Sequence, residues 1–152
     1  MTKKLILHIG TQKTGTTSIQ NYLAANRKLL AKQGIGYPID LGGYRTVTKE
    51  RNAHVLDRAA VIHAKPKAQT DEDRALIPAH IKRLKSHMKR FDTLVLSDER
   101  IWSDGTAYEK FWPSMSAVIR ELGFEEVRLV LYLRRQDRFS ESRWNQVVKC
   151  GF

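Results

Sequence analysis

The sequence predicts an α/β fold: a three-layer sandwich with a mostly parallel central sheet of about four strands and helices on both faces. Short apolar segments alternate along the chain with longer segments of helical periodicity. A helix between two successive strands favours a parallel pair, because the chain must cross back over the sheet. The length of 152 residues fits a single domain spanning 1–152.

Four short apolar segments predict the strands. Three of them are rich in Leu, Ile or Val and are followed by glycine or polar residues, as buried strands are, and the remaining one, 35–38, is a short stretch that ends at Pro38. The last is the most β-like, although it contains one arginine. The predicted strands are residues 4–9, 35–38, 93–97 and 127–133.

Helical periodicity predicts the connecting elements. Gly34 and Gly123 follow two of these segments as helix stops, and Pro78 suits the first turn of another. The polar stretch 64–74 predicts an exposed loop. The predicted helices are residues 16–32, 52–62, 78–90, 107–121 and 137–149.

The composition indicates a basic protein with an anionic partner. The net charge is +11, from 27 Lys and Arg against 16 Asp and Glu. These cations are widely spread along the chain, so a solvated basic surface is an alternative explanation. No recognised motif predicts binding to a specific nucleic acid. No apolar run approaches the ~20 residues of a membrane span, and no signal-peptide pattern is evident. The single cysteine, Cys150, fits a reducing compartment, so a cytoplasmic protein is expected.

The segment after the first strand predicts a phosphate-binding loop. Gly10 and Gly15 allow tight turns with positive φ, so successive N–H groups can converge on an anion at the following helix terminus. Lys13 adds a positive charge, and hydroxyls cluster at the same terminus, on Thr16, Thr17 and Ser18.

The loop differs from that of the nucleotide triphosphatases, Gly-x4-Gly-Lys-Ser/Thr. Gly10 and Gly15 have the same spacing, but Thr16 replaces the lysine, and Lys13 lies three places earlier. Thr17 stands where the magnesium-binding hydroxyl would be, and residues 94–99 imitate a Walker B strand. An atypical nucleotide triphosphatase or kinase is therefore an alternative.

The stretch Lys13-Thr14-Gly15-Thr16-Thr17 resembles the 5′-phosphosulfate-binding motif of the sulfotransferases, which have a P-loop-type fold. Gln12 before Lys13 is similar to the carbohydrate and bacterial branches. The resemblance implies 3′-phosphoadenosine 5′-phosphosulfate (PAPS) as donor, a hydroxyl or amine acceptor such as a carbohydrate, and no metal. Lys13 would hold the bridging oxygen and sulfuryl group and act in catalysis. The implied donor site comprises Gln12, Lys13, Thr14, Gly15, Thr16, Thr17 and Ser18.

A second anion site is predicted at the end of strand 127–133. Arg134 follows this strand, where open α/β sheets bind ligands, and an arginine offers a fork of donors for phosphate. Arg134 with Ser142 eight residues on resembles the family's 3′-phosphate motif. The usual Asn-Pro after the arginine is absent, and Ser140 is a rival for the hydroxyl. Surface pairing of Arg134 and Arg135 with Asp137 or Glu141 is the alternative.

The acceptor would need a general base. Related enzymes use a His or Glu outside the loop, which implies His54 here; Glu50 and Glu99 are alternatives. His8 lies within a strand, so packing is its simpler role. Residues 97–99 close a strand at the same sheet edge and are expected to line the cleft.

The resemblance also implies a C-terminally truncated chain. Family members generally continue well beyond the 3′-phosphate motif, whereas Phe152 lies close after it. A sheet without its later strands is expected to expose an apolar edge. A non-catalytic, basic anion-binding module is the third interpretation.

Overall fold

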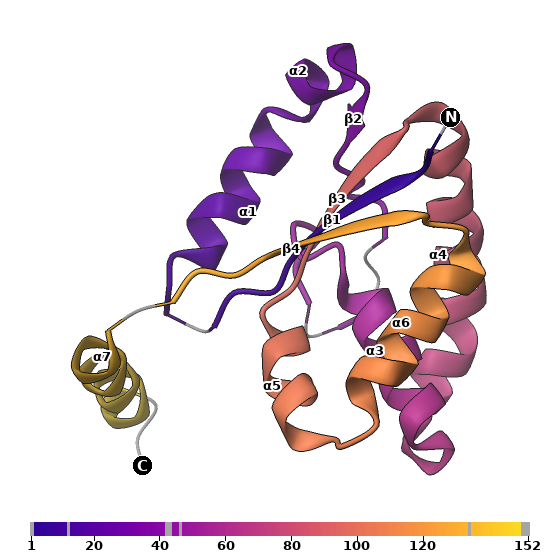
Figure 1. The fold of residues 1–152 in the computed structure, drawn as a ribbon. Helices are drawn as coiled ribbons and strands as arrows, with labels where there is room; N and C mark the ends of the chain where they lie inside the picture. Colours follow the sequence, from indigo (N-terminus) through magenta and orange to yellow (C-terminus); the bar gives the residue numbers. More distant parts are fainter. Residues whose placement is uncertain (1, 12, 42–43, 46, 134, 150–152) are drawn as a thin grey trace.

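A central sheet of four parallel strands organises the chain (Figure 1). The computed structural model describes residues 2–11, 13–41, 44–45, 47–133 and 135–149. The strand order is β2-β3-β1-β4, and Leu5 of β1 pairs with Leu94 of β3 and Val127 of β4. The strands are β1 (Lys4–His8), β2 (Ile35–Gly36), β3 (Thr93–Ser97) and β4 (Glu126–Val130).

Helices cover both faces of the sheet, which confirms the predicted α/β architecture (Figure 1). On one face, α1 (Thr16–Ala25) and α2 (Arg27–Lys32) pack over a small cluster that includes Ala24, Tyr37 and Val95. The larger core lies on the other face. It is covered by α3 (His54–Ala64), α4 (Asp71–Arg90), α5 (Arg100–Ala107) and α6 (Phe111–Leu122). A last helix, α7 (Gln136–Lys149), stands apart from the sheet.

The predicted helix 16–32 is wrong in one respect, because it is two helices separated at Asn26. The side-chain Nδ2 of Asn26 donates to the carbonyl of Tyr22 at 2.8 Å. Such local side-chain bonds compete with helix continuation, which is why asparagine is common at helix ends. The break turns α2 toward the start of β2.

The predicted loop 64–74 is also wrong, since α4 begins seven residues before Pro78. Thr70 and Asp73 form a capping box, in which each side chain bonds the other's backbone N–H. Arg58 of α3 donates to both carboxylate oxygens of Asp73, at 3.0 and 2.7 Å. These bonds fix the helix start, so Pro78 lies inside the helix and removes one backbone donor. A short 3-10 helix, η1 (Pro66–Ala68), precedes it.

Other helix and strand bounds also differ from the prediction. Residues 100–107 form α5, which the periodicity does not predict, and α6 begins at Phe111 and ends before Gly123. β2 is shorter than the predicted segment 35–38, and β4 begins one residue before the predicted segment 127–133 and ends three residues before its end. Apolar runs that extend past a strand are ambiguous in sequence, because periodicity does not mark where pairing stops.

The connections diverge between the two central strands. The chain leaves β1 through α1 and α2 on one face, whereas it leaves β3 through α5 and α6 on the other. The carboxyl ends of β1 and β3 therefore flank a topological switch point, which is where open α/β sheets bind ligands. The predicted phosphate loop follows β1 at this point.

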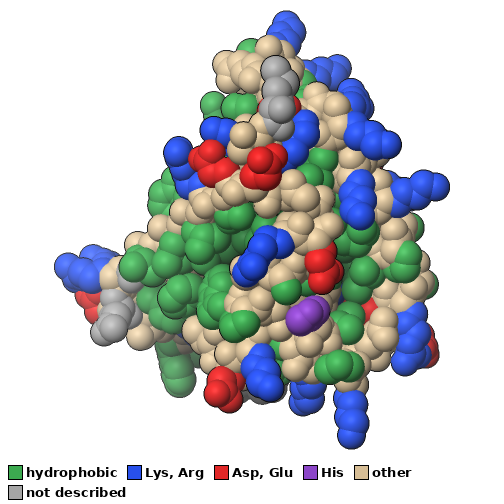
Figure 2. Space-filling view, turned by 45° about the vertical axis from the view of Figure 1, so that its right-hand side comes forward, with side chains coloured by type: hydrophobic (Ala, Val, Ile, Leu, Met, Phe, Trp, Pro, Cys, Tyr) green, Lys and Arg blue, Asp and Glu red, His purple; other side chains and the backbone are tan. Residues whose placement is uncertain are grey.

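The two edge strands of the sheet are β2 and β4. Apolar side chains are exposed at the β4 edge, as expected from the sequence. Val127 is 42% exposed and Leu129 is 53% exposed, and the exposure continues through Leu133. Hydrophobic side chains gather in a broad patch on the face shown in Figure 2. Within the residues that the structure describes, no helix combines the length and apolarity needed to cross a bilayer.

Candidate anion-binding and acid–base site

Two residues of the loop between β1 and α1 have left-handed backbone conformations. Gly15 has φ 84° immediately before α1, and Lys13 has φ 66°. The prediction assigned positive φ to both glycines, but Lys13, not Gly10, shares it with Gly15. A left-handed lysine is unusual, since its Cβ is strained there. The turn presents the backbone at the N-terminus of α1 without a side-chain cap on that terminus.

Gly10 is required by close packing instead. A Cβ at this position would lie 2.9 Å from Cγ2 of Thr16 and 3.1 Å from Nε2 of His8. Because neither neighbour is the free end of a long side chain, a larger residue would push the loop away from β1. The loop therefore sits directly on the end of the strand.

The hydroxyl groups of the loop divide into two sets. Thr14 donates to the carbonyl of Thr11 at 2.6 Å, so this hydroxyl closes the loop on itself. Thr16 is buried, whereas Thr17 and Ser18 are exposed on the first turn of α1. The exposed pair is the set available to a ligand at this helix terminus. Gln12, which was predicted to bind the donor, lies outside the described residues.

Ser97, the last residue of β3, ties the loop to the neighbouring strand. Its Oγ lies 2.8 Å from Nδ1 of His8 and accepts from Nε2 of Gln20 at 3.1 Å. Gln20 also donates to Oε2 of Glu99 at 3.2 Å. With its oxygen accepting from Gln20, the Ser97 hydroxyl can point its proton at Nδ1 of His8. In the tautomer that accepts this bond at Nδ1, the proton of neutral His8 lies on Nε2.

His8 is buried beneath the loop between β1 and α1. Its Nε2 has no hydrogen-bond partner among the described residues and lies 3.1 Å from the position that a Cβ on Gly10 would occupy. Burial lowers the pKa of His8 more than the charge of Glu99 raises it, which favours the neutral imidazole. The prediction that His8 is packed is correct, but it missed the unpartnered nitrogen.

A second buried network follows from Asp98, which is 0% exposed. Its Oδ2 lies 3.1 Å from Nδ1 of His54, and its Oδ1 accepts from Arg51 at 2.5 Å. Burial alone would raise the pKa of Asp98, but the His54 hydrogen bond and the Arg51 charge outweigh it and lower that pKa. An ionised Asp98 only accepts, so Nδ1 of His54 carries a proton and Nε2 is the basic nitrogen.

Backbone contacts fix His54 at the start of α3, close to the end of β3. The N–H of Ala53 donates to the carbonyl of Ser97, and Asn52 Oδ1 accepts from the N–H of Ser97 at 2.8 Å. The ring of Tyr44 meets the His54 ring edge-on at 4.5 Å. His54 is only 3% exposed, so its position is determined by the core rather than by solvent-side contacts.

The alternative bases are differently placed. Glu99 accepts from Gln20, and its Oε1 lies 3.8 Å from Nε of Arg51, so its carboxylate belongs to the same network. The backbone carbonyl of Glu50 accepts from the hydroxyl of Tyr37 at 2.7 Å. Ser97 and Asp98 are fully buried and organise the site from within, whereas the partly exposed Glu99 is the one of residues 97–99 that can line a cleft as predicted.

Asp57 and Asp104 form an acidic pair near the network of Asp98 and His54. Asp57, one turn after His54, is fully buried near Asp104, and burial followed by repulsion from Asp104 raises its pKa to about 8. Arg100 is the compensating cation, 3.7 Å from Oδ2 of Asp57 and 3.6 Å from Oδ2 of Asp104. In the part of the chain that is described, no group of three or more His, Cys, Asp or Glu residues could hold a metal ion.

The second predicted anion site lies only partly within the described residues. Arg134 lies outside the described residues, so its approach to Ser142 stays a prediction. Ser142 is half-buried on α7. Arg135 forms an exposed pair with Asp137, with Nε donating at 2.7 Å, as the surface-pair alternative anticipated.

The residues that sequence reasoning missed are the supporting ones. Gln20 and Arg51 hold the candidate residues through side-chain hydrogen bonds, and no motif marked them as supporting residues. Asn52, whose Oδ1 accepts from the N–H of Ser97, belongs to the Asn-x-His stretch with His54 that resembles bacterial sulfotransferases. A polar residue facing inward on a helix, such as Gln20, was the available signal. Comparisons with models of protein families, with curated proteins and with solved structures found no match to this chain.

Proposed function

We propose that this domain is a sulfotransferase that moves a sulfuryl group from PAPS to a hydroxyl or amine acceptor. The observation that carries the proposal is the position of the Lys13 loop. It lies at the switch point of the sheet, and His8, Gln20 and Ser97 tie it to the strand end that also holds His54. Donor loop and candidate base are therefore parts of one network.

The loop supplies what a phosphosulfate needs. The left-handed turns at Lys13 and Gly15 expose backbone donors at the start of α1, and Thr17 and Ser18 offer hydroxyls there. In sulfuryl transfer, negative charge builds on the leaving oxygen of the donor, as it does in phosphoryl transfer. The ammonium of Lys13 stabilises that charge.

His54 is the proposed general base. Its Nε2 takes the proton of the acceptor hydroxyl while the acceptor oxygen bonds to sulfur and the sulfur–oxygen bond to the donor phosphate breaks. Asp98 accepts from Nδ1 and stabilises the imidazolium that results. The products are the sulfated acceptor and 3′-phosphoadenosine 5′-phosphate.

The contacts of Asp98 favour this proposal over a magnesium-dependent nucleotide triphosphatase. A Walker B aspartate must offer its carboxylate to the metal or its water. Here Asp98 is fully buried and accepts from Arg51 and His54 and from the N–H of Arg100. Its oxygens are already occupied by protein donors.

Binding of 3′-phosphoadenosine 5′-phosphate tests the donor site. Calorimetry should give binding without magnesium, weakened about tenfold or more in Lys13→Ala and unchanged in Lys32→Ala, which removes an exposed lysine of α2. No binding, or equal binding by both variants, would contradict the proposal. Tighter, magnesium-dependent binding of ATP would indicate the nucleotide triphosphatase instead.

Sulfuryl transfer from labelled PAPS to a panel of hydroxyl and amine acceptors tests the base. His54→Gln should lower the rate by about 100-fold or more while nucleotide binding is retained. The control is His63→Gln, which changes an exposed histidine of the same helix. An unchanged rate in His54→Gln would exclude it as the base and leave Glu50 and Glu99 to be tested.

A further inference from the structure

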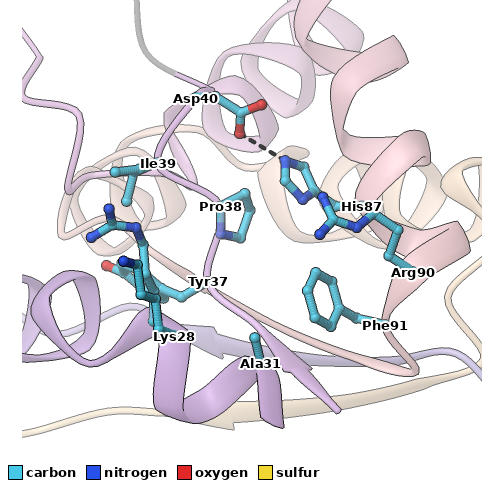
Figure 3. Close-up of a pocket in the computed structure, with 10 residues that line it drawn as sticks. Lys28, Ala31, Tyr37, Pro38, Ile39, Asp40, His87, Arg90 and Phe91 are labelled. Carbon is cyan, nitrogen blue, oxygen red and sulfur yellow. Dashed lines mark hydrogen bonds and ion pairs between the residues drawn. The ribbon is translucent and has the colours of Figure 1, made fainter.

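A cleft beside β2, at the edge of the sheet, is separate from the Lys13 loop between β1 and α1. It has a volume of about 290 Å³ and lies among α2, the segment after β2 and the C-terminal turn of α4 (Figure 3). Arg27 and Lys28 line it from α2, and these residues follow α1, whose ten residues lead away from the loop over about 15 Å. A ligand in the cleft would therefore not reach Lys13.

The cleft carries an excess of positive charge. Arg27, Lys28 and Arg90 are its permanent cations, and Asp40 is the one carboxylate among its lining residues. Asp40 is already engaged, because its Oδ1 lies 2.7 Å from Nε2 of His87. Among the described residues, no carboxylate lies within ion-pair distance of these three cations.

Between the cations the cleft is aromatic and apolar. Tyr37 and Phe91 both line it, and in Figure 3 Phe91 lies on the side of Arg90 and Tyr37 on the side of Lys28. The guanidinium of Arg90 lies 5.4 Å from the centroid of the Phe91 ring, and the His87 ring stacks on the same phenyl group. An arginine held over a ring keeps its planar fork available for an anion.

We propose that this cleft binds a small aromatic ester of sulfate or phosphate. The tetrahedral anion would bind the cations, with Arg90 offering two parallel donors, while the ring would pack between Tyr37 and Phe91. The volume suits a ligand of one ring, since clefts for drug-sized ligands begin at about this size. The site is independent of the proposed transfer reaction.

The probe is 4-nitrophenyl sulfate, with 4-nitrophenyl phosphate as a second ester. Each is titrated into ¹⁵N-labelled protein, and the amide signals of Ile39 and Phe91 are followed. Both signals should shift saturably, and the double variant Lys28→Ala, Arg90→Ala should weaken binding about tenfold or more. The control, Lys32→Ala with Lys89→Ala, removes the same charge from exposed sites on the same two helices and should leave binding unchanged.

Three results would overturn the proposal. Equal weakening in both double variants would mean general charge attraction, and equal affinity for inorganic sulfate would mean an adventitious ion only. Displacement by 3′-phosphoadenosine 5′-phosphate would place the ester in the loop instead. Unchanged binding of the ester in Lys13→Ala would support the cleft, whatever that variant does to the nucleotide.

Discussion

The loop after β1 and the segment after β4 both follow strands of the same parallel sheet, but they are built differently. The first rests on buried side chains: His8 and Ser97 meet beneath it, and Gln20 links them to α1. The second carries an exposed ion pair between Arg135 and Asp137, and the apolar residues leading to it are exposed. In Figure 1, α7 stands away from the sheet that α1 covers.

This difference separates two ways of making an anion site. A site held by buried polar groups is preorganised, because its donors cannot relax without leaving an unpaired polar atom in the core. A site on an exposed strand end must be ordered by its ligand, and that ordering reduces the affinity. The loop region should therefore dominate both stability and affinity, and substitutions can measure this.

The largest effect is expected from Asp98→Asn in the buried network. The change removes the nearer of the two carboxylates paired with Arg51, leaves the 3.8 Å contact with Glu99, and weakens the hydrogen bond to His54. Breaking a buried pair costs about 3 kcal/mol of unfolding free energy. Urea unfolding measures it, and Asp92→Asn, which removes an exposed partner of Lys3, should cost under about 0.5 kcal/mol. Similar losses of unfolding free energy in the two variants would contradict the difference between the buried network and the exposed surface pairs.

Asp57→Asn should stabilise the folded protein, in contrast to Asp98→Asn, and should do so only at higher pH. The pKa of Asp57 is raised to about 8 in the folded state, so the folded protein holds this proton more tightly than the unfolded chain does. Stability is therefore lost as the pH rises from about 4 to about 8, by up to roughly 1.4 kcal/mol for each pH unit. The variant cannot ionise, so at about pH 8.5 it should be more stable by ~2 kcal/mol or more, and at about pH 4 the two should match. A constant difference across this range would exclude the mechanism.

A smaller effect tests whether His8 and Ser97 act together. In a double-mutant cycle with His8→Phe and Ser97→Ala, the coupling free energy should be about 1 kcal/mol, because each variant removes the same hydrogen bond. Chemical denaturation of the four proteins gives the value. Additive effects would mean that the contact contributes nothing to stability.

The smallest effect on stability is expected in the segment that follows β4. The same cycle applied to Arg135 and Asp137 should give a coupling below about 0.5 kcal/mol, although their 2.7 Å contact is shorter than that of His8 and Ser97. Solvent screens exposed charges, so distance alone does not set the energy. A coupling as large as that beneath the loop would remove the distinction between the two regions.

The sequence predicted the sheet and the loop because both depend on local patterns. The apolar runs at β1 and β3 and the spacing of Gly10 and Gly15 are visible without any tertiary contact. The same holds for Gly123, which ends α6 in the left-handed conformation that only glycine adopts freely.

What the sequence could not predict depends on contacts between distant residues. The start of α4 is fixed by Arg58 bonding to Asp73, and the state of Asp98 depends on Arg51, 47 residues away. Resemblance alone indicates His54 as the base, whereas its tautomer follows from Asp98. Such pairings require the fold, because no periodicity marks which polar side chains will meet.

The backbone of Lys13 has a consequence for how related chains can diverge. Its left-handed conformation costs a lysine about 1 kcal/mol relative to glycine, so selection for folding alone would favour glycine at this position. Under the proposed function, donor binding by the Lys13 side chain offsets this cost. A chain that no longer bound the proposed donor could acquire Lys13→Gly and gain stability. Loss of the proposed function would then first appear as improved thermal resistance.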